Sequence, residues 1–237
     1  EIFDAAGSDI ACVIVEPVAG NMGVVPPAQG FLEALRDITA EHGALLVFDE
    51  VITGFRLGPG GAQGHYGVTP DLTTLGKIIG GGLPVGAFGG RADLMDRMAP
   101  DGPVYQAGTL SGNPIAVAAG AATLEVLLNE NPYPEMDRLA EKLFQGLTEG
   151  AEAAGKKVFA NRVATMGCAY FNDAPVDSFC KAADSDTDLF AKFHALMLDR
   201  GVYMAPSQFE ACFVSAAHTE EDIDAIIQAA GDSLSNI

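Results

Sequence analysis

Lys77 lies between a short apolar segment and a cluster of glycines, which is an unusual place for a lysine. It follows residues 71–76 (DLTTLG) and precedes residues 78–84 (IIGGGLP). Glycines lack the side chains that would screen the amine, and they let another group approach the backbone closely. An amine in apolar surroundings loses part of its preference for the charged form and becomes a nucleophile near neutral pH. We therefore expect Lys77 to form a Schiff base with a carbonyl compound.

Asp49 offers the second half of such a site. It follows the apolar run at residues 44–48 (ALLVF) and precedes Lys77 by 28 residues. An aspartate at the end of a buried strand can keep a pyridinium nitrogen protonated, and pyridoxal 5'-phosphate (PLP) needs that proton to act as an electron sink. Lys77 and Asp49 together predict a PLP site. Taken alone, each has an ordinary alternative: Asp49 as part of a turn or helix cap, and Lys77 as a solvated surface residue.

Composition limits the other classes of function. The chain has 237 residues, of which 49% are hydrophobic, so it can form one large domain or two smaller ones. Thirty-two acidic residues against 13 basic ones give a net charge of −19, which disfavours binding to nucleic acid or to an anionic membrane. No apolar stretch reaches the roughly 18 residues of a membrane span, and no signal sequence opens the chain. We expect a cytoplasmic enzyme.

The cysteines and histidines give no sign of a metal site. The four cysteines form no CxxC pair and have no histidine at ligand spacing; they are Cys12, Cys168, Cys180 and Cys212. Structural zinc sites depend on such close spacings, and disulfide frameworks are typical of short, cysteine-rich secreted chains. We therefore expect neither a bound metal nor a disulfide framework.

Apolar runs alternate with helical patterns in the first half of the chain, which predicts an α/β fold with a mostly parallel sheet. We expect strands at residues 10–15 and 44–48, a helix at about 28–42 that ends at Gly43, and an ordered loop at 52–70. Ligands bind beyond the carboxyl ends of strands in open α/β sheets. Glu16, Asp49 and Lys77 should therefore converge on one crevice.

The pattern changes after the helix that Asn113 is expected to cap, with Pro114 at its first position and its end near Leu128. From about residue 132 we expect a helix carrying Met136, Leu139, Leu143 and Leu147 as core residues, further helices near 186–200 and 219–236, and short strands near 158–171 and 212–216. The sequence thus predicts a large domain over residues 1–128 and a smaller α+β domain over residues 129–237.

Four segments of the chain resemble the class III PLP-dependent aminotransferase family. They are residues 13–23 (VIVEPVAGNMG), 48–56 (FDEVITGFR), 75–86 (LGKIIGGGLPVG) and 108–114 (GTLSGNP). Within that family the likeness is greatest to the glutamate-1-semialdehyde 2,1-aminomutases, and residues 206–211 (PSQFEA) support this narrower assignment. The resemblance implies fold type I of the PLP-dependent transferases and a homodimer. It also implies the isomerisation of glutamate-1-semialdehyde to 5-aminolevulinate in tetrapyrrole (porphyrin) biosynthesis, by intramolecular amino transfer.

The resemblance implies roles for five cofactor-binding residues. Lys77 would carry PLP as a Schiff base and move protons as general acid and base. Asp49 would pair with the pyridine nitrogen, and Val51 would pack against one face of the ring. Asn21 would lie near the ring hydroxyl, and Thr109 would reach the cofactor phosphate of the neighbouring subunit.

Glu16 and Glu210 are candidates for the substrate site on the same ground. The chain contains no arginine or lysine after Arg200, although a cation is the usual partner for the carboxylate of a second substrate. A carboxylate at Glu210 would repel dicarboxylates and favour a cationic diamine, as an aminomutase requires. The alternative is that Glu210 merely pairs with a local cation such as Arg56.

The resemblance also implies that a family member has a substantial region before residue 10. That region would hold a phosphate-binding loop, an aromatic residue against the second ring face and an arginine for the substrate carboxylate. We therefore expect an incomplete large domain with an uncovered sheet edge, and weak activity of the chain alone. Two alternatives to an aminomutase stay open: a class III aminotransferase with an external amino donor, of the ω-amino acid or ornithine type, or an inactive truncated module.

Overall fold

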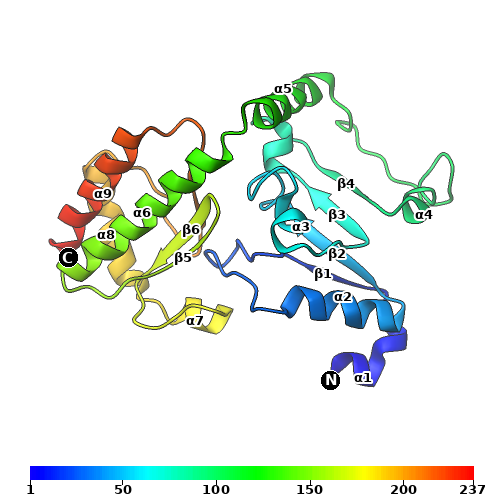
Figure 1. The fold of residues 1–237 in the computed structure, drawn as a ribbon, viewed down its shortest axis with the longest axis horizontal. Helices are drawn as coiled ribbons and strands as arrows, with labels where there is room; N and C mark the ends of the chain where they lie inside the picture. The colour runs from blue at the N-terminus through cyan, green and yellow to red at the C-terminus, as the bar shows by residue number, and fades with distance from the viewer. The chain divides into compact units, whose positions relative to one another are not determined.

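The computed structural model describes all 237 residues, which fold as two compact units (Figure 1). The first unit comprises Glu1–Pro17 and Gln29–Asn131, and the second comprises Val18–Ala28 and Pro132–Ile237. No helix combines the length and the apolar character needed to cross a membrane. The assignment of these parts as a partial PLP-binding domain and a small domain stays a prediction.

The first unit is built on a four-stranded sheet in the order β1-β2-β3-β4. The strands are β1 (Cys12–Val15), β2 (Leu45–Glu50), β3 (Leu72–Leu75) and β4 (Ala87–Gly90). The first three are parallel, and β4 is antiparallel to β3. This mixed, mostly parallel sheet confirms the predicted α/β class. Because β1, β2 and β3 are parallel, their carboxyl ends meet at one edge of the sheet.

Helix α2 (Phe31–His42) covers one face of this sheet (Figure 1). Its Leu32 is buried with Leu46 and Phe48 of β2 and with Val68, and these four side chains form the core of the unit. Gly43 ends the helix with a φ of 69°, a left-handed conformation that glycine adopts without steric cost. The helix and its last residue therefore agree with the sequence prediction.

The remaining elements of the first unit are short, apart from the last. They are α1 (Ile2–Ala6), η1 (Gly7–Asp9), α3 (Gly61–Tyr66), η2 (Lys77–Gly80), α4 (Ala92–Met95) and α5 (Pro114–Glu130). The expected loop at 52–70 was wrong in part, because it contains α3. This helix has only six residues, two of them glycines, and so carries no helical periodicity. As predicted, Asn113 caps α5, where its side chain accepts hydrogen bonds from the amides of Ile115 and Ala116.

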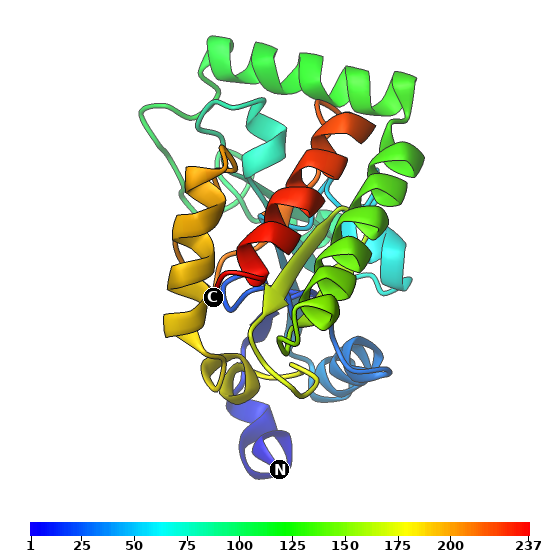
Figure 2. The ribbon, with the colours of Figure 1, turned by 90° about the vertical axis from the view of Figure 1, so that its left-hand side faces the viewer.

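The second unit is an α+β arrangement in which helices pack on an antiparallel sheet. The sheet consists of β5 (Phe159–Val163), β6 (Met166–Tyr170) and β7 (Cys212–Phe213), and the helices are α6 (Tyr133–Ala153), α7 (Phe179–Ala183), α8 (Thr187–Asp199) and α9 (Glu220–Leu234). Figure 2 shows α6 and α9 side by side in front of the strands. Leu139, Leu143 and Leu147 of α6 are buried in the core, as their spacing predicted.

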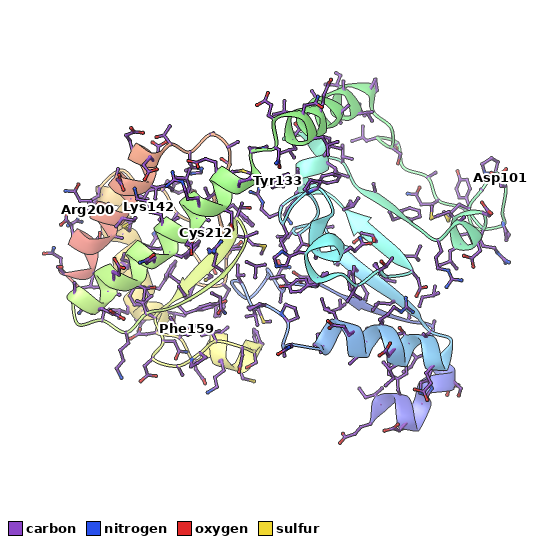
Figure 3. All side chains as sticks on the ribbon, viewed as in Figure 1. Asp101, Tyr133, Lys142, Phe159, Arg200 and Cys212 are labelled. Carbon is purple, nitrogen blue, oxygen red and sulfur yellow. The ribbon has the colours of Figure 1, made fainter.

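Polar contacts support the pairing of α6 with α9. Thr219 caps α9 in a reciprocal arrangement with Asp222. Lys142, labelled in Figure 3, forms ion pairs with Glu220 and Asp224, each at 2.5 Å. Hydrogen bonds from Arg138 and then from Lys142 lower the pKa of Glu220 to about 2. Because the acidic partners are exposed to water and Lys142 is only half-buried, the buried leucines of α6 contribute more to the packing than the ion pairs do.

Residues 18–28 belong to the second unit because Tyr170 of β6 holds them. The Tyr170 hydroxyl donates to the carbonyl oxygens of Met22 (2.9 Å) and Val24 (3.3 Å). Between them, Gly23 has a φ of 81°, and its amide donates to the Phe209 carbonyl at 2.7 Å. A Cβ at position 23 would lie 2.1 Å from the Tyr170 hydroxyl. Glycine is therefore required there by both conformation and space.

Candidate functional site

Asp49 lies within β2, one residue before the strand ends, and two donors hold its carboxylate. The Asp49 Oδ1 atom accepts hydrogen bonds from the amide of Val51 at 3.0 Å and from Thr74 Oγ1 at 3.1 Å. Thr74 is the residue that pairs with Asp49 in the register of β2 and β3. The side chain is half-buried. A carboxylate is thus fixed at the edge of the sheet where the parallel strands end.

Lys77 lies directly beyond β3 and begins the short turn η2. Its φ of 49° is a left-handed conformation, which is uncommon for a residue other than glycine and is often found at functional sites. Just before it, Gly76 leaves room for Val51, because a Cβ at position 76 would lie 3.2 Å from Val51 Cγ1. Lys77 is also the only lysine of the first unit.

The surroundings of Lys77 differ from the sequence prediction. We expected the amine in apolar surroundings, but the side chain is exposed. It lines an open depression together with Ile78, Gly82, Leu83, Pro84 and Val85. No segment beyond residues 77–85 lines this depression. These residues therefore present Lys77 to a ligand but do not by themselves bury it.

Helix α5 supports the turn that carries Lys77. A Cβ at Gly120 of α5 would lie 2.0 Å from the Ile79 carbonyl oxygen, and a Cβ at Gly81 would lie 2.5 Å from the Ala119 carbonyl oxygen. Gly81 also has a φ of 55°. Glycines on α5 and on the turn therefore allow the two backbones to pack in direct contact. This contact sets the position of the turn on the helix.

Glu50, the residue after Asp49, is a structural anchor that the sequence prediction missed. It is 1% exposed and accepts hydrogen bonds from Thr53 Oγ1 (3.0 Å), the amide of Ala62 (2.6 Å) and Gln63 Nε2 (2.9 Å). A charged group this deep is stable only when such donors surround it. Glu50 thereby ties residues 51–63 to the end of β2. Its position beside Asp49 was the only signal in the sequence.

The other candidates of the first unit lie on loops. Glu16 directly follows β1 and is half-buried, so β1, β2 and β3 bring Glu16, Asp49 and Lys77 to the same edge of the sheet. Their convergence on one crevice stays a prediction. Val51 lies at this edge through its contact with Asp49. Thr109 is exposed in a turn before α5, where the amide of Ser111 donates to the Gly108 carbonyl at 3.0 Å.

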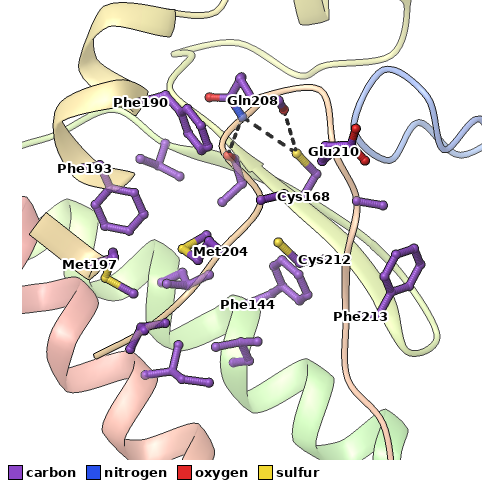
Figure 4. Close-up of a pocket in the computed structure, with 18 of the residues that line it drawn as sticks. Phe144, Cys168, Phe190, Phe193, Met197, Met204, Gln208, Glu210, Cys212 and Phe213 are labelled. Carbon is purple, nitrogen blue, oxygen red and sulfur yellow. Dashed lines mark hydrogen bonds between the residues drawn. The ribbon is translucent and has the colours of Figure 1, made fainter. Parts of the chain in front are cut away.

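Asn21 and Glu210 belong to the second unit, and both side chains are exposed. Asn21 lies in the segment that Tyr170 holds. Glu210 lies at an apolar cavity of about 300 Å³ in this unit (Figure 4). The walls of the cavity include Phe144 of α6, and Phe190 and Met197 of α8.

Gln208 and two cysteines also line this cavity. Gln208 donates through Nε2 to the Ala169 carbonyl at 2.9 Å, and its Oε1 accepts from the Phe171 amide at 3.4 Å. Burial raises the pKa of Cys168 to about 12 and that of Cys212 to about 11. Both thiols therefore stay protonated near neutral pH, and neither is suited to be a nucleophile.

Comparisons with known proteins identify relatives of this chain. The sequence profile of the family described as aminotransferase class-III matches residues 1–231. The chain is 58% identical over 232 residues to glutamate-1-semialdehyde 2,1-aminomutase of Persephonella marina, covering 98% of this chain and 54% of that protein. It is 60% identical over 230 residues to the same enzyme of Pelotomaculum thermopropionicum, covering 97% of this chain and 53% of that protein. The chain thus spans about half the length of these relatives.

Solved structures show the same likeness. An omega-transaminase from Sphaerobacter thermophilus superposes with a TM-score of 0.92 at 29% identity, over 98% of this chain and 53% of that one. A glutamate-1-semialdehyde aminomutase from Pseudomonas aeruginosa PAO1 gives a TM-score of 0.86 at 29% identity, with the same coverage. A structure described as a transaminase with PLP bound gives 0.88 at 27% identity, over 99% of this chain and 54% of that one. With its α/β sheet, its lysine beyond β3 and this match over nearly its whole length, the chain belongs to the class-III aminotransferase family.

Proposed function

We propose that the protein to which this chain belongs is a PLP-dependent aminomutase that converts glutamate-1-semialdehyde to 5-aminolevulinate by intramolecular amino transfer. The observation that carries the proposal is the placement of Lys77 in a left-handed conformation at the sheet edge where Asp49 is held. The two aminomutase relatives support the choice of reaction.

The residues at this edge fit PLP. When bound, PLP supplies an electron sink that stabilises negative charge on the adjoining carbon of the substrate. Asp49 keeps Oδ2 available for a ring nitrogen, because its two hydrogen bonds both go to Oδ1. Val51 would lie against the ring. We assign Asn21, from the second unit, to the ring hydroxyl, and Thr109 to the cofactor phosphate of the neighbouring subunit. The Nζ of Lys77 would hold the cofactor and would serve as the acid and base that moves a proton between substrate carbons.

The charge of the chain favours isomerisation over exchange of two substrates. After Arg200 no arginine or lysine is present to bind the carboxylate of a second substrate such as 2-oxoglutarate, whereas Glu210 supplies a negative charge. A cationic diamine would be favoured by Glu210 and a dicarboxylate repelled. We assign Glu16 to the substrate site as well. A class III aminotransferase with an external amino donor is the second candidate, favoured by the omega-transaminase likeness.

We also propose a homodimer in the cytoplasm. Helix α5 exposes an unusual number of large apolar side chains, among them Ile115 (71% exposed), Val117 and Leu128. Such exposure is typical of a surface that is covered in the assembled protein. Thr109 precedes this helix, so a subunit contact there would bring Thr109 to the neighbouring cofactor. The cysteines are free, in keeping with a reducing compartment.

The test uses the protein as its gene encodes it. Purified enzyme should form 5-aminolevulinate from glutamate-1-semialdehyde faster than it transaminates 2-oxoglutarate with several amines. Faster transamination would assign the protein to the second candidate. Borohydride reduction and mass spectrometry should place the cofactor on Lys77, and Lys77→Ala should remove this adduct. An adduct on Lys142 or Lys156 would refute the assignment.

A further inference from the structure

We propose that Thr74 is a positioning residue that orients the Asp49 carboxylate toward the cofactor ring. The inference rests on the proposed function, because it concerns how Asp49 meets the pyridine nitrogen. Thr74 lies on β3, directly across from Asp49 on β2, and its Oγ1 donates to Asp49 Oδ1 at 3.1 Å. No chemical step is assigned to the hydroxyl itself.

The geometry around Asp49 explains why a second donor matters. The terminal torsion of an aspartate side chain is broad, so one hydrogen bond leaves the carboxylate free to turn. The Val51 amide reaches Oδ1 from the following turn at 3.0 Å, and Thr74 reaches the same atom from the neighbouring strand. Two donors from different directions fix the plane of the carboxylate. They leave Oδ2 as the atom available to a ligand, because both hydrogen bonds go to Oδ1.

The threonine side chain suits this task. Threonine is branched at Cβ, which limits its χ1 rotamers. The backbone of the strand therefore determines the direction of the hydroxyl group. Thr74 is also half-buried, which keeps the hydrogen bond partly screened from water. A carboxylate that is already fixed loses less conformational entropy on pairing with the ring nitrogen than a mobile carboxylate would.

The adjacent Thr73 has a different partner and provides a matched control. Successive side chains of a strand point to opposite faces. Thr73 Oγ1 accepts from Gln63 Nε2 at 2.9 Å, and Gln63 in turn holds Glu50. Thr73 therefore belongs to the anchor of residues 51–63 and has no hydrogen bond to Asp49. The same substitution at the two positions removes a hydroxyl from the same strand but from opposite faces.

The experiment compares Thr74→Val, Thr74→Ser and Thr73→Val in the protein as its gene encodes it. The readouts are kcat, KM, the equilibrium affinity for PLP, and the ¹⁵N chemical shift of PLP labelled at the ring nitrogen. Thr74→Val should lower kcat about tenfold, which corresponds to the loss of one ordinary hydrogen bond, with a smaller change in KM. The ¹⁵N shift should move toward the unprotonated form. Thr74→Ser should restore both, and Thr73→Val should leave the ¹⁵N shift unchanged.

Two results would overturn the inference. The first is that Thr74→Val keeps the ¹⁵N shift and the kcat of the wild type. The second is that Thr73→Val changes the ¹⁵N shift and kcat as much as Thr74→Val does, which would indicate a general weakening of β3. If Thr74→Val does not fold, Thr74→Ala against Thr74→Ser gives the same comparison. Asp49→Asn separates this inference from the proposed function: if it changes neither turnover nor the ¹⁵N shift, the assignment of Asp49 fails as well.

Discussion

Gly120 in α5 lies so close to the carbonyl oxygen of Ile79 that a Cβ at position 120 would be 2.0 Å from it. Ile79 belongs to η2, the turn that Lys77 begins. The helix is therefore a support against which the turn rests, without any side chain between the two backbones. Whatever moves the helix away from the turn also moves the residue that we assign to the cofactor.

The first prediction follows from this contact. Gly120→Ala should force the two backbones apart and lower the free energy of unfolding by about 1–3 kcal/mol, the usual cost of overpacking. PLP binding should weaken as well, because η2 shifts. Urea unfolding and cofactor titration measure the two effects.

Gly231→Ala in α9 is the control for the same change of residue. A Cβ there meets nothing within 4 Å, so the substitution should raise stability by about 0.5–1 kcal/mol through helix propensity alone. If Gly120→Ala proves as stable as Gly231→Ala, the close contact does not set the position of the turn.

The second prediction concerns Asp71, a buried carboxylate of the first unit. It accepts a hydrogen bond from the Leu46 amide (2.8 Å) and pairs with Arg36 (2.9 Å) and Arg91 (2.8 Å). Burial by itself raises the pKa of Asp71, but the three donors outweigh it and hold the pKa below its ordinary value. Asp71→Asn should cost about 3 kcal/mol, because it leaves Arg36 without its anion and removes one of the two carboxylates that pair with Arg91.

The pH dependence of Asp71 has a definite sign. A carboxyl with a lowered folded-state pKa contributes stability that is complete above its unfolded-state value of about 3.9 and declines as the pH falls below it. The stability difference between the wild type and Asp71→Asn should therefore be constant from pH 7 to pH 5 and narrow toward pH 3. Urea unfolding at these pH values measures it. A difference that widens toward low pH would contradict the ion-pair account.

The third prediction concerns the hydroxyl of Tyr170. Tyr170→Phe leaves the carbonyl oxygens of Met22 and Val24 without their donor, which should cost about 1–3 kcal/mol. Hydrogen exchange should become faster at the Gly23 amide. Tyr203→Phe is the control, because the Tyr203 side chain is 82% exposed and its substitution should change neither quantity. Unchanged exchange in Tyr170→Phe would mean that other contacts hold the segment.

The fourth prediction concerns the four thiols. Cys12 and Cys180 are exposed, whereas burial raises the pKa of Cys168 to about 12 and that of Cys212 to about 11. At pH 8 the thiolate fraction of the latter two is about one in a thousand or less. Iodoacetamide should therefore modify Cys12 and Cys180 in folded protein and all four in urea, as peptide mass spectrometry can show. Rapid modification of Cys168 in folded protein would refute this.

Much of the fold could be predicted because its signals are local. The helix ended by Gly43, the helix capped by Asn113 and the leucines of α6 are each specified by a few neighbouring residues. Strand β2 was predicted from its apolar run, although it extends through Asp49 and Glu50. The mostly parallel character of the sheet followed from the alternation of strands and helices.

What the sequence did not reveal depends on contacts between distant residues. Helix α3 is stabilised by Glu50, which precedes it by 11 residues, and strand β4 is a four-residue segment with two glycines that pairs with β3. The hydrogen bond from Thr74 to Asp49 requires the register of two strands. The exposure of Lys77 could not be predicted either, because local composition does not report which segments cover a side chain.

The path of the chain makes the two units hard to separate. It leaves the first unit after Pro17, returns at Gln29 and leaves again after Asn131. Cleavage between Asn131 and Pro132 would therefore yield two fragments. The N-terminal fragment would still carry residues 18–28, to which Tyr170 of the other fragment donates its hydrogen bonds. The fragments should remain associated until that segment is released. Cleavage of one peptide bond would convert a covalent connection into a binding equilibrium between the two fragments. The association constant of the fragments would then measure how strongly the second unit binds residues 18–28.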